Sequence, residues 1–300
     1  MIRRLASLLL ALLCLCPAAC AESGPAGTET VFPSEEYEYT GKLRARYDSD
    51  TLVWTVESAT PGNVFCVITK IWVQDPERQI RKVCAPWGES LADPMRLMKK
   101  LPEAVLGTNA SGYINKTYPD LPEGYPGEPA DYYFTTLGSV VVTDGEVLRN
   151  LEGVPFWGLA LTSDGITLYR GADNADVLAA NPIQTWAFFE NCAMQVDGED
   201  TLPEEGTWPM AREKHPRTVL ARINRNNYVL LHVLKSDHSN GASLYWINRF
   251  FSAHFRAEWV YNLDGGSSSS LIYRTKGKNA RLKRHVSNRQ GIMDILCFTE

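Results

Sequence analysis

The sequence lacks the patterns that mark several common classes of protein. It has no Cys-x-x-Cys motif, and no two of its five histidines have the helical spacing of a metal site, so neither a metal nor another cofactor is indicated. Beyond the first residues, no apolar run reaches the about eighteen residues that a transmembrane helix requires. The formal charge of −5 over 300 residues does not favour a nucleic-acid partner. We therefore expect no nucleic acid and no stable membrane insertion.

The composition does favour a folded protein. The chain is 44% hydrophobic and 10% aromatic over 300 residues. That amount of apolar side chain is enough to bury a substantial core, in one large domain or two small ones. Disorder is not indicated for most of the chain.

The first residues have the pattern of a secretory leader. Two arginines precede an apolar run at 5–15, and small residues follow it, which predicts a signal peptide over 1–21. The alternative of a lipid anchor at Cys20 is less favoured, because Pro17 stands where an apolar branched residue is needed. We expect a secreted or extracytoplasmic protein that begins near Glu22.

Four cysteines remain after the leader: Cys66, Cys84, Cys192 and Cys297. Export would place them in a compartment where disulfides persist. We expect buried or disulfide-bonded structural cysteines, and Cys66 with Cys84 is the first pair to test.

The segments after the leader differ in character. Residues 22–47 are rich in Glu, Ser, Gly, Pro and Thr, which predicts a linker or an N-terminal edge segment before a domain at 48–300. Residues 51–73 have the β-branched and aromatic composition of strands. Asp93-Pro94 has the character of a helix start, and Ala104–Gly107 that of a short buried strand leading into a polar loop.

Three Asp-Gly pairs in the middle of the chain lie between apolar runs. Each predicts a tight hairpin turn, since this dipeptide tolerates the positive φ that such turns demand. The aspartates are therefore interpreted as turn formers and not as catalytic carboxylates: Asp144, Asp164 and Asp197.

The C-terminal third reads as strand, helix, strand, at 228–234, 244–255 and 259–263. That order is compatible with a crossover unit, whereas the hairpins upstream indicate antiparallel pairing. The prediction is an α+β fold with a large mixed, mostly antiparallel sheet, hairpins and a few packed helices.

One carboxylate stands at the end of an apolar strand, in the segment Asn262-Leu-Asp264-Gly265-Gly266 followed by four serines. Glycines let a ligand approach the backbone closely, and hydroxyls such as that of Ser268 add hydrogen-bond donors. This combination suits an oxygen-rich substrate such as a sugar or a phosphate. Taken alone, it is equally compatible with a Gly-Ser turn.

Two further polar segments stand beside apolar strands. Arg217-Thr218 begins one, and an arginine there can bind an anionic oxygen pair, although an ordinary ion-pair arginine is the simpler interpretation. Asn109 ends another, where its amide can orient a sugar hydroxyl. Asn109-Ala-Ser and Asn115-Lys-Thr also match the glycosylation acceptor pattern, which is short and often fortuitous.

In order along the chain, these segments resemble the phosphodiester glycosidase family. The matching segments are Asn109–Tyr113, Pro216–Thr218 and Asn262–Ser268, and the second and third are specific when found together. The resemblance spans roughly 104–298. It implies an exported hydrolase that cleaves the bond between a sugar and a phosphodiester, with a phosphate-containing glycan as substrate.

The resemblance also implies roles for individual residues. Asp264 would act as base or charge stabiliser, Arg217 would stabilise the departing phosphate, and Asn109 would orient the sugar or water. The sequence does not identify a second carboxylate, if one is required. Glu190 and Glu258 are the candidates, and a solvated or ion-paired residue is the simpler interpretation of each. The residues implied to contact the substrate are Thr218, Asn262, Gly265, Gly266 and Ser268.

Two other functions compete with this hypothesis. A non-catalytic module for cell-wall or capsular glycan would use Trp157, Trp186 and Trp259 as stacking platforms, although buried tryptophans serve equally well as core. A metal-dependent phosphodiesterase is less favoured, since no His/Asp ligand cluster is evident.

The sequence also has one local cluster of positive charge. The simpler interpretation of this cluster is a solvated loop or strand face, and the alternative is a patch that attracts phosphate-bearing substrates. The cluster consists of Lys276, Lys278, Arg281, Lys283 and Arg284.

Overall fold

Strands dominate the part of the chain that the structure, a computed structural model, describes. The described residues are 37–116, 121–122, 124–190, 192–277, 280–286 and 290–300. The expected leader at 1–21, most of the segment at 22–47, Thr117 of the second glycosylation pattern and Lys278 of the basic cluster lie outside them.

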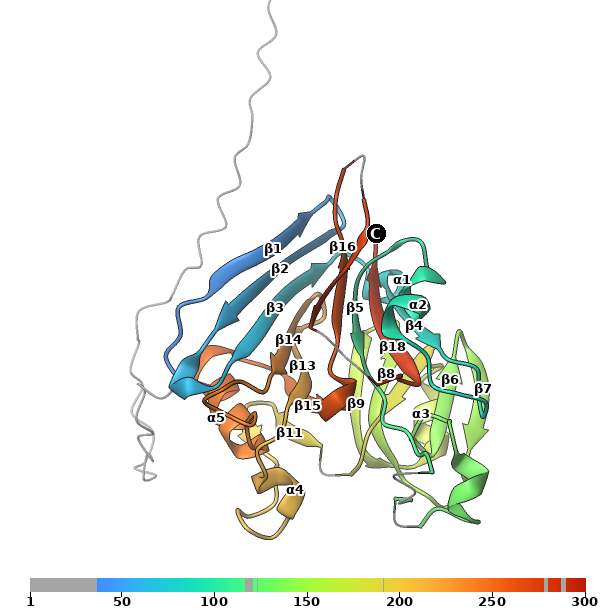
Figure 1. The fold of residues 1–300 in the computed structure, drawn as a ribbon. Coiled ribbons are helices and arrows are strands. Elements are labelled where there is room, and N and C mark those ends of the chain that lie inside the picture. Colours follow the sequence, from blue (N-terminus) through green and yellow to red (C-terminus); the bar gives the residue numbers. More distant parts are fainter. Residues whose placement is uncertain (1–36, 117–120, 123, 191, 278–279, 287–289) are drawn as a thin grey trace, which may run out of the picture. The chain divides into compact units, whose positions relative to one another are not determined.

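The largest sheet has eight strands, and β1 forms one of its edges (Figure 1). Neighbouring strands in it are antiparallel. In spatial order the strands are β1 (Lys42–Asp48), β2 (Leu52–Ala59), β3 (Cys66–Val73), β14 (Asn227–Val233), β13 (Arg217–Asn224), β15 (Trp259–Leu263), β11 (Ala193–Val196) and β12 (Glu199–Asp200).

Three smaller antiparallel sheets complete the strand framework. The five-stranded sheet has the order β17 (Leu282–Val286), β16 (Leu271–Arg274), β5 (Ala104–Asn109), β18 (Asp294–Thr299) and β4 (Ile80–Cys84). The three-stranded sheet has the order β10 (Gln184–Ala187), β8 (Phe156–Thr162) and β9 (Gly165–Ala172). The last sheet pairs β6 (Val140–Thr143) with β7 (Glu146–Asn150).

Helices are short and lie outside the sheets. They are α1 (Pro76–Gln79), α2 (Pro94–Lys99), α3 (Asn174–Ala179), α4 (Pro209–Arg212) and α5 (Leu244–His254). As the sequence predicts, Asp93 caps α2 by accepting a hydrogen bond from the backbone N–H of Arg96 at 3.2 Å. Among the described residues, no helix combines the length and the apolar character needed to cross a bilayer.

The core lies on both faces of the eight-stranded sheet, because its strands alternate in the direction of their side chains. In β13, Leu220 faces the smaller sheets, whereas Val219 and Ala221 face α5. A further apolar cluster packs Leu97 and Met98 of α2 against the outer side of the five-stranded sheet. The result is a layered α+β fold, which confirms the predicted fold class.

The predicted crossover unit is present. Both β14 and β15 pair antiparallel with β13, which lies between them, so β14 and β15 are parallel to each other and α5 connects them. Ser243 caps α5 through its hydroxyl, which accepts a hydrogen bond from Trp246 N at 3.1 Å. This crossover places the start of β13 beside the end of β15, where Thr218 pairs with Leu263.

The three Asp-Gly pairs form the predicted hairpin turns. Asp144 and Gly145 connect β6 to β7 with φ of 50° and 79°, and Asp197 and Gly198 connect β11 to β12 with φ of 52° and 82°. The turn between β8 and β9 places its positive φ, 86°, at Gly165 alone. The turn interpretation of these aspartates is confirmed.

The disulfide alternative for the cysteines is wrong, because all four described cysteines are free thiols. Cys66 lies on β3 of the eight-stranded sheet and is buried in the cluster beneath α5. Cys84 ends β4 of the five-stranded sheet, and its Sγ lies 3.9 Å from Thr143 Oγ1. The two strands belong to different sheets, a placement that spacing along the chain does not reveal.

Candidate active site

Three loops that are far apart in the sequence meet at the ends of β5, β13 and β15, and we call this meeting point the junction. Asp264 N donates to Ala110 O at 2.9 Å, which joins the loop after β15 to the loop after β5. Gly266 N donates to Pro216 O at 2.8 Å, which joins the loop after β15 to the start of β13. The structure therefore brings together the three segments that the sequence singles out.

The side chain of Asn109 connects the segments of the junction through hydrogen bonds. Its side-chain Nδ2 donates to Asp264 O at 2.5 Å, and its Oδ1 accepts from Thr218 Oγ1 at 3.1 Å and from Ser270 N at 2.9 Å. Thr218 Oγ1 also lies 3.2 Å from Ser269 Oγ. Because the amide of Asn109 is buried and occupied, it positions the other residues. A buried and occupied amide is also a poor acceptor for glycosylation.

Asp264 carries the carboxylate of the junction. Burial raises its pKa to about 7, and the negative charge of Asp294 adds to the increase, while the Ser268 hydroxyl and the Gly265 N–H oppose it. Oδ1 accepts from Gly265 N at 2.9 Å, whereas the enclosed Oδ2 has no hydrogen-bond partner among the described residues. A carboxyl group with this pKa can both accept and release a proton near neutral pH.

The two glycines at the junction are required by its shape. A Cβ atom on Gly265 would lie 2.8 Å from Pro216 O and 3.2 Å from Arg217 Cα, so no larger residue fits without moving the start of β13. Gly266 has a φ of +60°, opens a 3₁₀ turn at Gly266–Ser268 and is exposed. Ser268 is buried beside Asp264.

Arg217 and Asn262 are buried next to this carboxylate loop. Arg217 Nη2 donates to Met210 O at 2.7 Å and to Glu213 O at 3.1 Å, at the end of α4, and Arg217 Nε has no partner among the described residues. Asn262 is fully buried, and neither atom of its amide has a partner there. Buried polar atoms without partners commonly mark positions of water or ligand.

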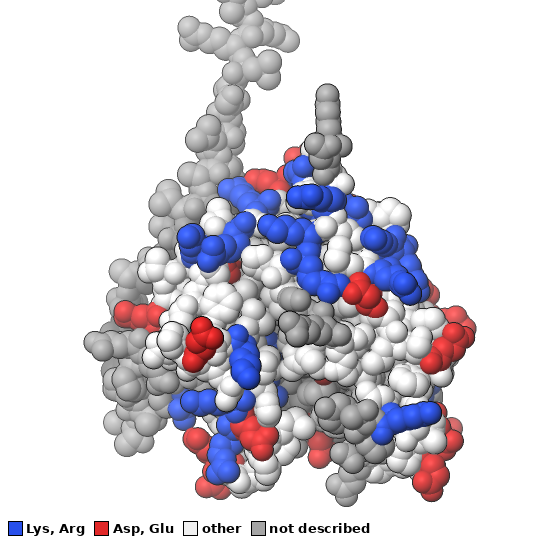
Figure 2. All heavy atoms as spheres, in the orientation of Figure 1, with Lys and Arg blue, Asp and Glu red and all other residues white. Residues whose placement is uncertain are grey.

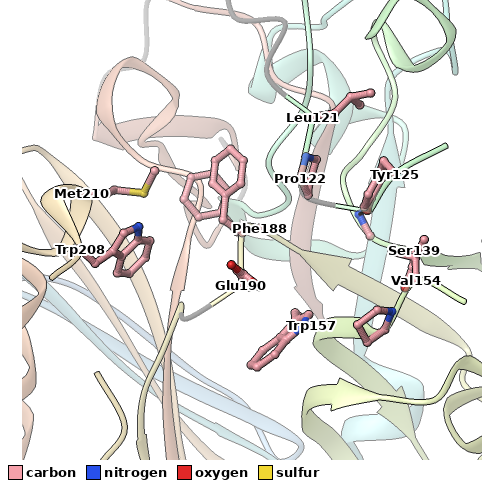
Figure 3. A pocket seen from close by; sticks show the side chains of 13 residues that line it. Leu121, Pro122, Tyr125, Ser139, Val154, Trp157, Phe188, Glu190, Trp208 and Met210 are labelled. Carbon is pink, nitrogen blue, oxygen red and sulfur yellow. Dashed lines mark hydrogen bonds between the residues drawn. The ribbon is translucent and has the colours of Figure 1, made fainter. Parts of the chain in front are cut away.

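An aromatic cavity of about 260 Å³ adjoins the junction (Figure 3). Phe188 in its wall packs against Gly112, where a Cβ atom would lie 2.4 Å from the ring, and Met210 in its wall accepts the hydrogen bond from Arg217. The cavity is lined by Leu121, Pro122, Tyr125, Gly138, Ser139, Val154, Pro155, Trp157, Phe188, Phe189, Glu190, Trp208 and Met210. Its walls suit a ligand with an apolar face and polar edges.

Several residues that the sequence leaves open differ in where they lie relative to the cavity. Glu190 lines it, between Trp208 and Trp157 in Figure 3, whereas Glu258 forms an ion pair with Arg222 at 2.8 Å. Trp157 is the only partly exposed member of the three proposed stacking tryptophans, since Trp186 and Trp259 are buried in the core. Trp208 is a cavity residue that sequence reasoning missed, as a lone tryptophan in a loop gives no periodic signal.

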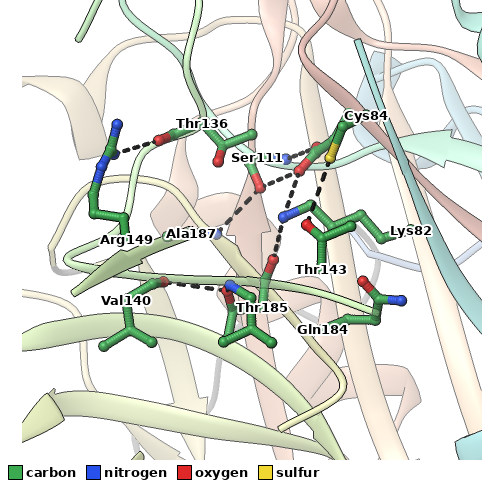
Figure 4. Close-up of polar contacts among 12 residues, drawn as sticks. Lys82, Cys84, Ser111, Thr136, Val140, Thr143, Arg149, Gln184, Thr185 and Ala187 are labelled. Atoms are coloured by element: carbon green, nitrogen blue, oxygen red, sulfur yellow. Dashed lines mark hydrogen bonds and ion pairs between the residues drawn. The ribbon is translucent and has the colours of Figure 1, made fainter. Parts of the chain in front are cut away.

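A buried charged network holds the loop after β5 (Figure 4). Lys82 Nζ lies 3.4 Å from Asp294 Oδ2, and both side chains are 0% exposed. Asp294 accepts two 2.7 Å hydrogen bonds from Ser111, one from its backbone N–H and one from its hydroxyl, and Lys82 donates to Thr185 O at 2.7 Å. The sequence does not reveal this pair, because its two members lie on strands that are far apart in the chain, β4 and β18.

His232 lies beneath the junction, between the two larger sheets. Its Nε2 is 3.0 Å from Thr108 Oγ1 and 3.2 Å from Ser270 O. Burial lowers its pKa to about 3, against an ordinary histidine value of about 6.5. The folded protein thus keeps this ring neutral, while the unfolded chain takes up a proton below about pH 6.5.

The free energy of unfolding is therefore expected to fall in acid. The contribution of His232 is fully present above about pH 6.5 and is lost as the pH falls towards 3, by about 1.4 kcal/mol per pH unit. Urea unfolding at about pH 7 and about pH 5 should show a loss near 2 kcal/mol from this group that is absent in His232→Gln. Equal losses in both proteins would contradict the prediction.

One comparison with known proteins identifies a family, and another identifies a shared fold. A family model described as phosphodiester glycosidase matches residues 103–299. A search of curated proteins found no match. Among solved structures, the zebrafish N-acetylglucosamine-1-phosphodiester alpha-N-acetylglucosaminidase catalytic domain, auto-inhibited by pro-peptide, aligns with a TM-score of 0.61 and 18% identity over 87% of this chain and 88% of that chain. A hypothetical protein from Synechocystis aligns with a TM-score of 0.52 and 12% identity, over 88% and 68%. At these identities the two structures show a shared fold.

Proposed function

Because the chain belongs to the phosphodiester glycosidase family, we propose that it is an exported hydrolase that cleaves the bond between a sugar and a phosphodiester. The export part of the proposal is supported by the leader pattern at 1–21. The substrate class follows from the family and from the character of the site.

The observation that carries the proposal is the carboxyl group of Asp264, with its pKa of about 7, at the junction of three polar loops. Hydrolysis at an anomeric carbon needs a group that can exchange a proton with water near neutral pH. Asp264 has that property because its carboxyl group is enclosed, while its backbone is fixed by Ala110 and Asn109. The geometry therefore favours a reaction over simple binding.

In the proposed reaction, the bond between the anomeric carbon and the phosphodiester oxygen breaks. The phosphate leaves with the electron pair, and a water molecule bonds to the anomeric carbon after giving a proton to Asp264. Arg217 supplies positive charge near the departing phosphate, and its guanidinium is fixed by two carbonyl groups. Asn109 holds Asp264 in place, and Gly265 and Gly266 leave room for the substrate. The remaining polar side chains around the substrate are those of Thr218, Asn262 and Ser268.

The aromatic cavity is the proposed sugar site. Trp157 and Trp208 offer ring faces for the apolar face of a pyranose, and Glu190 offers a hydrogen-bond acceptor for its hydroxyls. Glu190 is also the proposed second carboxylate, since Glu258 is engaged by Arg222. Aromatic walls suit a glycan-binding module equally well, so binding alone does not distinguish the two functions.

An assay with a soluble sugar-1-phosphodiester tests the proposal. The purified protein is incubated with the substrate in water enriched in heavy oxygen, with and without chelator, and free sugar and phosphomonoester are measured by mass spectrometry. We expect both products, with the heavy oxygen on the sugar, because the carbon–oxygen bond is the one that breaks. Heavy oxygen on the phosphate together with loss of activity in chelator would identify a metal-dependent phosphodiesterase, and glycan binding without any product would identify a binding module.

A further inference from the structure

A group of exposed lysines and arginines gathers on one face of the protein. Figure 2 shows Lys and Arg side chains concentrated at the end of the molecule formed by β1 and the hairpin of β16 and β17. We call this set the basic face: Lys42, Arg44, Arg46, Lys276, Arg281 and Lys283, all exposed. It extends the local cluster in the sequence by three residues from the other end of the chain.

The two parts of the basic face lie side by side, because the sheets that carry them pack together there. Trp54 of β2 and Tyr273 of β16 are in ring contact, with centroids 5.3 Å apart. Lys276 reaches across to β1, where its Nζ donates to Asp48 O and lies 4.2 Å from the centre of the Tyr47 ring. The strands concerned, β1 and β17, are each an edge strand of one of the two larger sheets.

The charges of the basic face are largely unneutralised. Within the part of the chain that the structure describes, Arg46 pairs with Asp48, and the other five residues form no ion pair. Burial is the main cause that lowers the pKa of His285 on β17, and the positive charges of Lys283 and Arg44 lower it further, so a cation from each strand lies near this ring. A chain with a formal charge of −5 has here a region of the opposite sign, which attracts anions.

Protection of sheet edges is the simpler explanation for lysine and arginine on β1 and β17. Charges of either sign protect an edge, however, and opposite signs on two adjacent edges would avoid repulsion. Cations outnumber anions on both strands here, since β1 carries three cations and Asp48, and β17 carries Lys283 and Arg284. Edge protection accounts for charge on each strand, but it does not account for an excess of one sign on both.

The basic face is connected to the junction by one strand. β16 begins directly after the loop of Gly266–Ser268 and ends at the hairpin that carries Lys276 (Figure 1). Six residues, 269–274, separate that loop from the hairpin, and at about 3.3 Å each they place the hairpin up to roughly 20 Å beyond it. An extended polymer spans such a distance easily, whereas a single small anion does not.

We propose that the basic face binds a linear glycan with repeated phosphodiester groups and holds it near the junction. The inference rests on the proposed function for its choice of polymer, since a phosphodiester-linked chain carries both the bond to be cleaved and the negative charges that Lys42, Lys276 and Lys283 attract. Binding is through charge along the chain and not through a pocket for one group.

The test uses a triple variant, Lys42→Gln, Lys276→Gln and Lys283→Gln, against a matched control. The control, Arg170→Gln, Lys235→Gln and Arg256→Gln, removes the same number of positive charges from exposed positions on other elements. Binding of poly(glycerol phosphate) is measured at several salt concentrations, with neutral dextran and anionic lipid vesicles as comparison ligands. Unfolding curves of all three proteins show that each is folded.

We expect the wild type and the control to bind the polymer with an affinity that falls with salt. The triple variant should bind about tenfold or more weakly, with a slope of log affinity against log salt that is smaller by roughly two, as three fewer phosphates are neutralised. Equal binding by the two variants, no binding by the wild type, or preference for the lipid vesicles would overturn the proposal.

Hydrolysis of the small soluble sugar-1-phosphodiester separates this proposal from the proposed function. None of the three substituted lysines belongs to the junction, so the triple variant should keep the wild-type kcat on that substrate. If the wild type does not hydrolyse it, the proposed function fails, whatever the polymer binding. If the wild type hydrolyses it but the triple variant binds the polymer as tightly as the wild type does, only the proposed role of the basic face fails.

Discussion

Replacement of Asp264 by Asn is expected to lower kcat for a sugar-1-phosphodiester by about 10²–10³ while the protein stays folded. The amide has the same shape as the carboxyl group but neither accepts nor releases a proton near neutral pH. Its oxygen can still accept the 2.9 Å hydrogen bond from Gly265 N, and Asp264 Oδ2 has no partner among the described residues to lose. Stopped assays with the purified variant measure the change.

Asp197→Asn is the matched control for this variant. Asp197 lies in a hairpin turn with a φ of 52°, which asparagine tolerates well, so kcat and stability should stay at the wild-type level. The pH profile adds a second readout. With a pKa of about 7, Asp264 should produce a limb of kcat near neutral pH in the wild type, and Asp264→Asn should lack it. A variant with near-normal kcat would remove Asp264 from the mechanism.

Replacement of Lys82 by Met is expected to lower the free energy of unfolding by about 3–5 kcal/mol. The change leaves the carboxylate of Asp294 buried without its cation, although the two bonds from Ser111 remain. A loss of this size follows from an uncompensated buried charge and not from lost packing, since methionine fills nearly the same volume. Urea unfolding at about pH 7 measures the difference.

The double variant Lys82→Met, Asp294→Leu separates stability from site geometry. With both charges gone, much of the lost stability should return, because apolar replacement of a buried ion pair is often neutral. Activity should not return, since Asp294 anchors Ser111 and thereby the loop whose Ala110 O accepts the hydrogen bond from Asp264. Full recovery of kcat in the double variant would show that Asp294 has no positioning role.

Local chemistry made much of the fold predictable. The Asp-Gly turns and the capped start of α2 each depend on a few neighbouring residues, and the structure has them where the sequence predicts them. The strand predicted at Ala104–Gly107 is present and extends to Asn109. The strand–helix–strand unit around α5 was equally predictable from the sequence, because the apolar residues of the helix repeat over three turns. The order of strands in the sheets depends on contacts between distant segments and was not predictable in this way.

The residues of the site also fall into two groups, those that local sequence predicts and those that depend on contacts between distant segments. Asp264 and its glycines, Arg217 and Asn109 were recognisable because each stands where an apolar strand meets polar residues. The Cys66–Cys84 disulfide was wrong, and the Lys82–Asp294 pair and the aromatic wall with Trp208 were missed. Each of these depends on which strands and loops become neighbours.

The sequence by itself determined many of the elements of this protein, its turns and the three polar segments through which it resembles the phosphodiester glycosidase family. Only the tertiary structure decided that these segments share one junction, that burial raises the pKa of Asp264 to about 7, and that the basic residues of β1 and the β16–β17 hairpin form one face. The physical reason is that burial and charge proximity are properties of neighbours in space. Turn and strand preferences are properties of neighbours in the chain.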